Sequence, residues 1–228
     1  MTLNIGFLVF PNVQQLDLTG PYEVFASVAD MAVHLIWKDQ DPIRSATGLM
    51  LTPTMRLADC PQLDVICVPG GGGVNALLTD AVVLDFIRRQ AAGARYVTSV
   101  CTGSLVLGMA GLLKGRKASS HWNAVDLLPR LGAIATEGRV VRDGNIITAG
   151  GVTSGIDFGL VLLAELRGEE VARRVQLSLE YAPEPPFNSG TPMSAPPELV
   201  AQARAGMAGS RAERERLLPL TGAAQAVS

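Results

Sequence analysis

The fold is decided by the stretch Tyr96-Val97-Thr98-Ser99-Val100-Cys101-Thr102-Gly103-Ser104-Leu105. Its first five residues favour a buried strand, and apolar residues then recur at helical spacing as far as Lys114 and Gly115. We therefore predict that Cys101 occupies a strand-to-helix turn. Because a helix start carries unpaired N–H groups and the positive end of the helix dipole, a thiol there is biased toward the reactive thiolate. A buried structural cysteine is the alternative.

The composition predicts one domain whose main partner is neither nucleic acid nor a membrane. The 228 residues are 48% hydrophobic and carry a formal net charge of −2, which argues against nucleic acid or an anionic membrane surface as a partner. Gly, Pro and charged residues interrupt every apolar run before it reaches membrane-spanning length, and residues 1–6 do not resemble a secretory signal. Three cysteines, an odd number, argue against a disulfide framework, so we expect a cytoplasmic protein.

Short β-rich runs alternate with amphipathic segments, as is typical of parallel βαβ units and an α/β fold. Strands are expected over 3–10, 32–38, 64–69 and 96–100, with a hairpin over 139–148 around Asp143-Gly144. Helices are expected over 21–28, 82–92, 105–113, 122–131, 156–166 and 171–179. We assign 1–187 to this domain and 188–228 to a C-terminal arm and tail, with a helix around 198–218 and a frayed end at 221–228.

Asp17 follows the first predicted strand, at the edge of the sheet where ligands of open parallel sheets bind. Thr19 is suited to cap the next helix and Pro21 to its first turn, which places Asp17 on the loop before the helix. Its neighbours Leu16 and Leu18 can desolvate the carboxyl group, raise its pKa and make it a proton donor or shuttle. The alternative is a solvated loop residue or one bonded to a nearby amide.

Two glycine turns follow other predicted strands. After the strand 65–69 the amides of Gly71, Gly72 and Gly73 can approach a ligand closely and stabilise negative charge. The run lacks the residues of a phosphate-binding loop, so we expect no nucleotide cofactor. Gly150 is expected to border the same pocket and to shift during the reaction. For both turns the alternative is a glycine required by turn geometry alone.

The remaining cysteines and the two histidines do not have metal-site spacing, and we expect no metal ion. Cys67 alternates within an apolar strand and is expected in the core, whereas Cys60 lies in a loop. His34 is expected to be a structural histidine of a strand. His121 is either a helix cap and hydrogen-bond anchor or a base for Cys101.

These residues together resemble the ThiJ/PfpI superfamily. The likeness is carried by Val100–Ser104, 111–118 and His121-Trp122, and the further stretches 10–11, 14–21, 68–71, 140–145 and 155–158 narrow it to one branch of the superfamily. The superfamily implies a flavodoxin-like three-layer sandwich with a mainly parallel central sheet and the nucleophile on a strained elbow. Within it, residues from about 3 to 187 resemble the isonitrile hydratases, which implies addition of water to an isonitrile to give an N-substituted formamide, without cofactor or metal.

Two positions separate the chain from other branches of the superfamily. Peptidase-like members usually carry histidine directly after the cysteine, where this chain has Thr102, and many others place a glutamate where Asp17 stands. For a hydratase, the chemistry implies that Cys101 forms a covalent thioimidate and that Asp17 serves as general acid and then base. Amides of Thr102 and of 71–73 stabilise charge or hold water.

A ligand-sensing domain is the alternative function. Transcription regulators of the arabinose-operon activator type carry a similar domain, with the cysteine turn, the His-Trp pair and the run 180–183. Such regulators continue into roughly a hundred residues of basic helix-turn-helix structure, and only about forty Pro- and Ala-rich residues follow Phe187 here. We therefore expect an enzyme, whose partners are a small isonitrile and water. The superfamily implies a homodimer, which the arm after Tyr181 would suit.

Overall fold

A seven-stranded sheet with the order β10-β11-β7-β6-β1-β2-β5 forms the centre of the structure, a computed structural model that describes residues 2–220. Its strands are β1 (Leu3–Leu8), β2 (Met31–Trp37), β5 (Met55–Arg56), β6 (Val65–Val68), β7 (Tyr96–Val100), β10 (Val140–Asp143) and β11 (Ile146–Ala149). Neighbouring strands are parallel, except in the antiparallel hairpin β10–β11, which turns at Gly144 with a positive φ of 62°. The end 221–228, which we expected to fray, lies outside the described residues.

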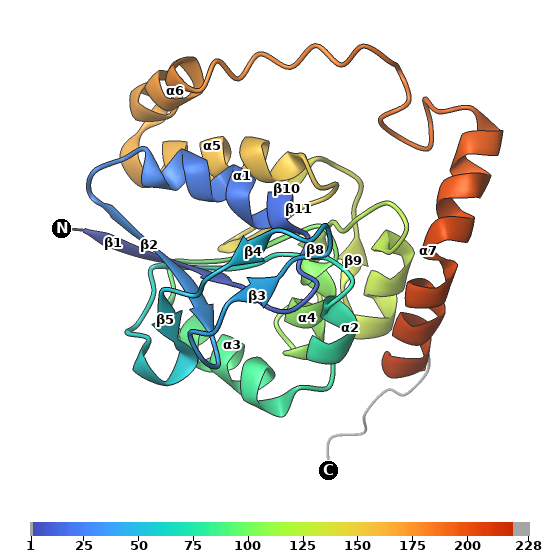
Figure 1. Ribbon diagram of the computed structural model, residues 1–228, viewed down its shortest axis with the longest axis horizontal. Helices are drawn as coiled ribbons and strands as arrows, with labels where there is room; N and C mark the ends of the chain where they lie inside the picture. The colour runs from blue at the N-terminus through green and yellow to red at the C-terminus, as the bar shows by residue number, and fades with distance from the viewer. Residues whose placement is uncertain (1, 221–228) are drawn as a thin grey trace.

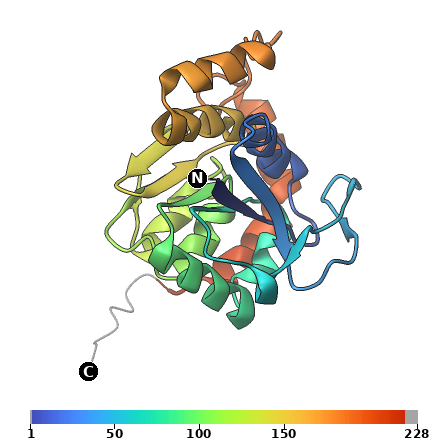
Figure 2. The ribbon, with the colours of Figure 1, turned by 90° about the vertical axis from the view of Figure 1, so that its left-hand side faces the viewer.

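Helices cover both faces of this sheet (Figures 1 and 2). One face is covered by α1 (Gln15–Ala26) and α5 (Ser154–Arg167), with α6 (Glu169–Ser178) packed on α5. The other is covered by α3 (Ala81–Gly93) and α4 (Gly103–Met109), with the short α2 (Val74–Leu77) beside α4. The predicted flavodoxin-like three-layer sandwich is confirmed. Because both faces are covered, all four residues of β6 are buried.

Aromatic packing joins the first strand to the helices above it. The ring of Phe7 on β1 lies 6.4 Å from that of Tyr22 and 6.2 Å from that of Phe25, both on α1. Phe25 in turn meets Phe158 of α5 edge-on at 6.1 Å. Such pairs contribute about 0.5–1.5 kcal/mol each beyond their burial. They hold α1, which carries Asp17, against the carboxyl end of β1.

The start of α1 differs from our prediction. The helix begins at Gln15 and not at Pro21, which lies inside it, so Asp17 belongs to its first turn. Tertiary contacts hold the chain just before the helix, where the Gln14 N–H donates to the Gly70 carbonyl at 2.8 Å. Thr19 is not a cap, because its hydroxyl donates to the Gln15 side chain. A proline is tolerated here at the cost of one helical hydrogen bond.

Other differences concern short elements. The segment 122–131, predicted as an α-helix, contains the 3₁₀ helix η2 (Val125–Leu131) with Pro129 inside it and a left-handed Gly132 after it. Seven elements too short for a periodic pattern were not predicted: β5 and α2, whose bounds are given above, and β3 (Ile43–Arg44), β4 (Met50–Leu51), η1 (Leu57–Asp59), β8 (Lys117–Ala118) and β9 (Ile134–Ala135).

The C-terminal helix α7 (Pro197–Leu217), predicted over 198–218, returns to the body of the molecule after an extended arm (Figure 1). It packs against α2, and its Arg211 pairs with Asp126 at 2.6 Å. Arg130 binds the end of α7 through the main-chain oxygens of Glu215, Leu218 and Pro219. We keep the division at residue 187 as a proposal. Among the helices of residues 2–220, none combines the length and apolar character needed to cross a bilayer.

Candidate active site

Cys101 sits on a strained turn between β7 and α4, as the sequence predicts. Its φ is 57°, in the left-handed region, which costs a non-glycine residue about 1–2 kcal/mol. The turn is held by its own backbone: the N–H donates to the Ala149 carbonyl at 2.9 Å, and the carbonyl accepts the Ser120 and Ser104 hydroxyls. Strain held this firmly is a feature of functional sites.

Asp17 lies beside this thiol and is fully buried. Its Oδ2 accepts the Gly70 N–H at 2.8 Å, whereas Oδ1 has no hydrogen-bond partner among the described residues. Burial raises the pKa of Asp17 to about 7, and the hydrogen bonds from Gly70 and the Cys101 thiol offset part of that effect. The predicted desolvated carboxyl group is confirmed and the solvated-loop alternative is wrong, while the other alternative, a bond to a nearby amide, is present as well in the bond from Gly70.

The predicted bias of Cys101 toward thiolate is wrong. Burial raises the pKa of Cys101 well above its ordinary value, the Asp17 carboxylate raises it further, and hydrogen bonds from Thr102 lower it only in part. The helix that follows has only seven residues, and the thiol is 5% exposed. The reactive thiolate therefore needs a nearby acceptor for its proton, and Asp17 is positioned to be that acceptor.

Three parts of the site meet at Gly70, namely the first turn of α1, the end of β6 and the end of β7. A Cβ added there would lie 2.6 Å from the Thr102 nitrogen and 2.8 Å from Asp17 Oδ2. Only glycine leaves room for the ends of β6 and β7 and the first turn of α1 to approach so closely. Gly70 was not predicted as a site residue, although it is the first glycine after a buried strand.

The next glycines shape the turn. The Gly71 N–H donates to the Thr102 hydroxyl at 3.1 Å, and the Gly73 N–H donates to the Asn12 carbonyl at 3.1 Å. Both amides are therefore used within the protein, which favours the turn-geometry alternative for these two positions. Gly72 is exposed, and its ligand-binding role stays a prediction.

Gly150 lies directly after β11 and next to the segment that supports Cys101. A Cβ there would meet the Gly138 carbonyl at 3.0 Å and the Ser119 hydroxyl at 3.3 Å. The neighbouring Ser120 holds the Cys101 carbonyl at 3.1 Å. Gly150 is thus connected to the elbow through this serine pair, and its movement during the reaction stays a prediction.

His121 has partners that suit an anchor. Its Nδ1 accepts the Asn123 N–H at 3.3 Å and its ring packs on Trp122, with the centroids 5.3 Å apart. Burial and the charge of Arg214 lower the pKa of His121. Within residues 2–220 no hydrogen bond joins it to Cys101. This geometry favours the anchor over the base.

Comparison with known proteins identifies the family of this chain. The sequence profile of the DJ-1/PfpI family matches residues 4–165. The chain belongs to the DJ-1/PfpI family. An isonitrile hydratase from Pseudomonas putida is 64% identical over 204 residues, which cover 90% of each chain. A solved ThiJ/PfpI family protein from Pseudomonas syringae has a TM-score of 0.92 and 44% identity, covering 95% of this chain and 90% of its own. The HTH-type transcriptional regulator GbdR from Pseudomonas aeruginosa is 29% identical over 189 residues, 78% of this chain and 50% of the regulator.

In this DJ-1/PfpI protein the remaining cysteines and His34, the side chains that were considered as metal ligands, have structural surroundings. Burial raises the pKa of Cys67 to about 12 and that of Cys60 to about 11. The predicted core position of Cys67 is confirmed. His34 Nε2 lies 3.2 Å from Asn4 Oδ1, as expected of a structural histidine. Within residues 2–220 no three His, Cys, Asp or Glu side chains gather in a way that could hold a metal ion.

One charged residue near the site of this DJ-1/PfpI protein was missed in the sequence. Arg214 of α7 is only 6% exposed, and burial lowers the pKa of its guanidinium, an effect that the charge of a Cys101 thiolate partly offsets. In the sequence it is one of several arginines in a charged helix, and the helical pattern does not distinguish it from its neighbours.

Proposed function

We propose that this protein is an isonitrile hydratase that adds water to an isonitrile and releases an N-substituted formamide. The main structural support for this proposal is the buried Asp17 carboxyl group beside the Cys101 thiol, whose Oδ1 has no hydrogen-bond partner among the described residues. The 64% identity to a Pseudomonas putida protein of that name supports the same enzyme class. A carboxyl group with a pKa of about 7 exists in both forms at neutral pH, as a group that donates and accepts protons requires.

The first step joins sulfur to carbon. Asp17 takes the thiol proton, and the Cys101 sulfur uses its electron pair to form a bond to the terminal isonitrile carbon. That carbon then receives the proton from Asp17, so the product is a neutral thioimidate, R–N=CH–S–Cys101. The Thr102 N–H stabilises the sulfur while it is charged, since this hydrogen bond lowers the pKa of Cys101.

The second step uses the carboxylate that the first step leaves. Asp17 takes a proton from water as the hydroxyl adds to the thioimidate carbon, and then passes this proton to the nitrogen. The tetrahedral adduct then collapses: the carbon–oxygen double bond forms, the hydroxyl proton returns to Asp17, and the carbon–sulfur bond breaks with its electrons on sulfur. Formamide leaves, and transfer of the proton from Asp17 to the thiolate restores the starting thiol and carboxylate.

The shape of the site suits this substrate class. An isonitrile is a slender, linear and uncharged group, and a thiol that is 5% exposed admits such a group more readily than a branched carbonyl compound. Every atom in both steps comes from the isonitrile, water, Cys101 or Asp17, so the reaction as proposed proceeds without a cofactor. We propose a homodimer as the working form, as expected of the superfamily.

The test is formamide production from an aryl isonitrile by the purified protein, beside the Cys101→Ala and Asp17→Asn variants. We expect turnover by the natural protein, its loss in Cys101→Ala, and a fall of roughly a hundredfold to ten-thousandfold in Asp17→Asn. Normal turnover by Cys101→Ala would rule out covalent catalysis.

A ligand sensor is the second candidate, favoured by the 29% identity to a transcriptional regulator over 78% of this chain. A sensor binds its ligand without turning it over. Saturable binding of isonitriles with no formamide from the natural protein would support the sensor and reject the hydratase.

A further inference from the structure

Two sequence motifs that have no part in the proposed reaction meet at the start of α5. Residues 155–158 carry part of the likeness to isonitrile hydratases, and residues 180–183 carry part of the likeness to transcription regulators. In the structure the Tyr181 hydroxyl donates to Asp157 Oδ1 at 2.7 Å. Burial and this bond to a carboxylate raise the pKa of Tyr181, so the hydroxyl keeps its proton at neutral pH and acts as the donor.

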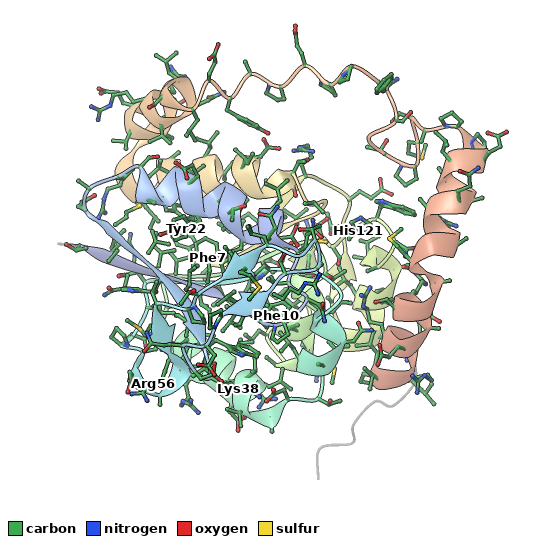
Figure 3. All side chains as sticks on the ribbon, in the orientation of Figure 1. Phe7, Phe10, Tyr22, Lys38, Arg56 and His121 are labelled. Atoms are coloured by element: carbon green, nitrogen blue, oxygen red, sulfur yellow. The ribbon has the colours of Figure 1, made fainter. Side chains whose placement is uncertain are left out.

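The backbone at Tyr181 is strained and firmly held. Glu180 has a φ of 49°, and it is one of three non-glycine residues within 2–220 that have a positive φ, as Cys101 is. The Tyr181 N–H donates to the Gln176 carbonyl at 3.0 Å, and the Gln176 side chain donates to the Tyr181 carbonyl at 3.2 Å. Beyond it residues 182–191 are exposed and leave the body of the molecule as the arm (Figures 1 and 3). Strain that the surrounding structure maintains is common at functional positions.

Arg139 binds both ends of the linker 150–153, which joins β11 to α5. Its carbonyl accepts the Gly150 N–H at 2.9 Å. Its Nε pairs with Asp157 Oδ2 in the first turn of α5, and its Nη2 donates to the Thr153 hydroxyl at 3.5 Å. A single arginine thus spans the linker from its first residue to its last.

The chain on either side of this linker contacts the active site. Before it, the Ala149 carbonyl accepts the Cys101 N–H at 2.9 Å. After it, a Cβ added to Gly155 would lie 3.5 Å from the Asp17 carbonyl oxygen and 3.5 Å from the Val100 side chain. A shift of the linker therefore acts on the backbone of both Cys101 and Asp17, and so on the distance between the thiol and the carboxyl group.

We propose that Arg139, Asp157 and Tyr181 form a positioning cluster that fixes the linker 150–153 beside the active site. Arg139 holds one oxygen of the Asp157 carboxylate and Tyr181 holds the other. Because an exposed ion pair contributes little by itself, the bond from the partly buried Tyr181 decides how firmly this carboxylate is held. The inference rests on the proposed function for its effect on turnover, but not for its effect on the linker.

The test compares the natural protein with Tyr181→Phe, which loses one oxygen and keeps the ring. Amide hydrogen exchange of the peptide 150–157 is read by mass spectrometry. We expect this exchange to become roughly tenfold faster, because local opening no longer has to break the bond to Asp157. With an aryl isonitrile, kcat should fall by roughly tenfold to a hundredfold at a nearly unchanged KM, since the cluster orients the reacting groups and binds no substrate.

Tyr96→Phe is the matched control. It removes the same atom from a hydroxyl that donates to Glu165 Oε2 at 3.4 Å, on the same helix but near its other end. We expect it to leave both the exchange and the kinetics unchanged. Asp157→Ala should be at least as severe as Tyr181→Phe, and adding Tyr181→Phe to it should change nothing further, because the two residues act through one bond.

Natural exchange of 150–157 in Tyr181→Phe would overturn the proposal, and so would an equal change in Tyr96→Phe. Faster exchange with a natural kcat would also overturn it, because the linker would then be loosened without effect on the reaction. If Asp157→Ala does not fold, the comparison of Tyr181→Phe with Tyr96→Phe still decides. Hydrogen exchange needs no substrate, so failure of the hydratase proposal would be seen separately, as an absence of formamide from the natural protein.

Discussion

The Gly70 N–H donates to Asp17 Oδ2 at 2.8 Å, and this bond joins the first turn of α1 to the end of β6. The other oxygen, Oδ1, is buried and has no hydrogen-bond partner among the described residues. One backbone amide thus fixes one of the two carboxylate oxygens and leaves the other unbonded. The bond requires a residue without a side chain at position 70.

Replacing Gly70 with alanine should therefore damage the site. The new Cβ would lie 2.6 Å from the Thr102 nitrogen and 2.8 Å from Asp17 Oδ2, so one of these groups must move. Because a displacement of about 1 Å can cost a hundredfold in rate, we expect kcat/KM to fall by about that factor. Gly206→Ala, at an open position on α7, is the control and should retain activity. Natural kinetics in Gly70→Ala would contradict this account of the site.

Asp17→Asn should change the pH dependence of stability. The pKa of Asp17 is about 7 in the folded protein against an ordinary value of 3.8, so both states are protonated below pH 3.8 and stability is lost as pH rises toward 7. Asparagine keeps an acceptor for Gly70 and carries no charge. We expect urea unfolding to show that the variant gains stability relative to the natural protein between pH 4 and pH 8. A pH-independent difference would mean that Asp17 is not destabilised by burial.

Cys101→Gly should be more stable than Cys101→Ala by roughly 1 kcal/mol, although both should be inactive. Glycine adopts a φ of 57° without strain, whereas alanine does not. The control is the same pair of substitutions at Ser104, in the right-handed conformation of α4, where alanine should be the more stable. Thermal unfolding of the four variants measures both differences, and the same order at both positions would show that the elbow is unstrained.

Gly150→Ala should alter formation or breakdown of the covalent intermediate. Its Cβ would press on the Gly138 carbonyl at 3.0 Å and the Ser119 hydroxyl at 3.3 Å, next to the serine that holds the Cys101 carbonyl. Rapid-quench kinetics of a single turnover would show a slower phase. Gly151→Ala meets no atom within 4 Å and is the matched control. Identical transients for the two variants and the natural protein would assign Gly150 to turn geometry alone.

Local patterns were enough to predict the parallel sheet, the hairpin and the elbow. The run 96–105 changes from strand to helical spacing at one cysteine, and the structure has that change at the same place. The start of α1 could not be predicted in this way. Gln14 is fixed there by a hydrogen bond to Gly70, which is far away in the sequence, and this contact outweighs the local signals of Thr19 and Pro21.

The sequence by itself determined the fold class, the position of Cys101 at the end of a buried strand and the pairing of that thiol with Asp17, because residue periodicity and short motifs are local properties. Only the tertiary structure decided the protonation of that pair, since burial by distant elements raises the pKa of both groups and outweighs the start of α4. It also decided the burial of Arg214, which a helix far along the chain places against Asn75 of α2. Electrostatic environment depends on what packs around a group, and packing joins residues that the sequence separates.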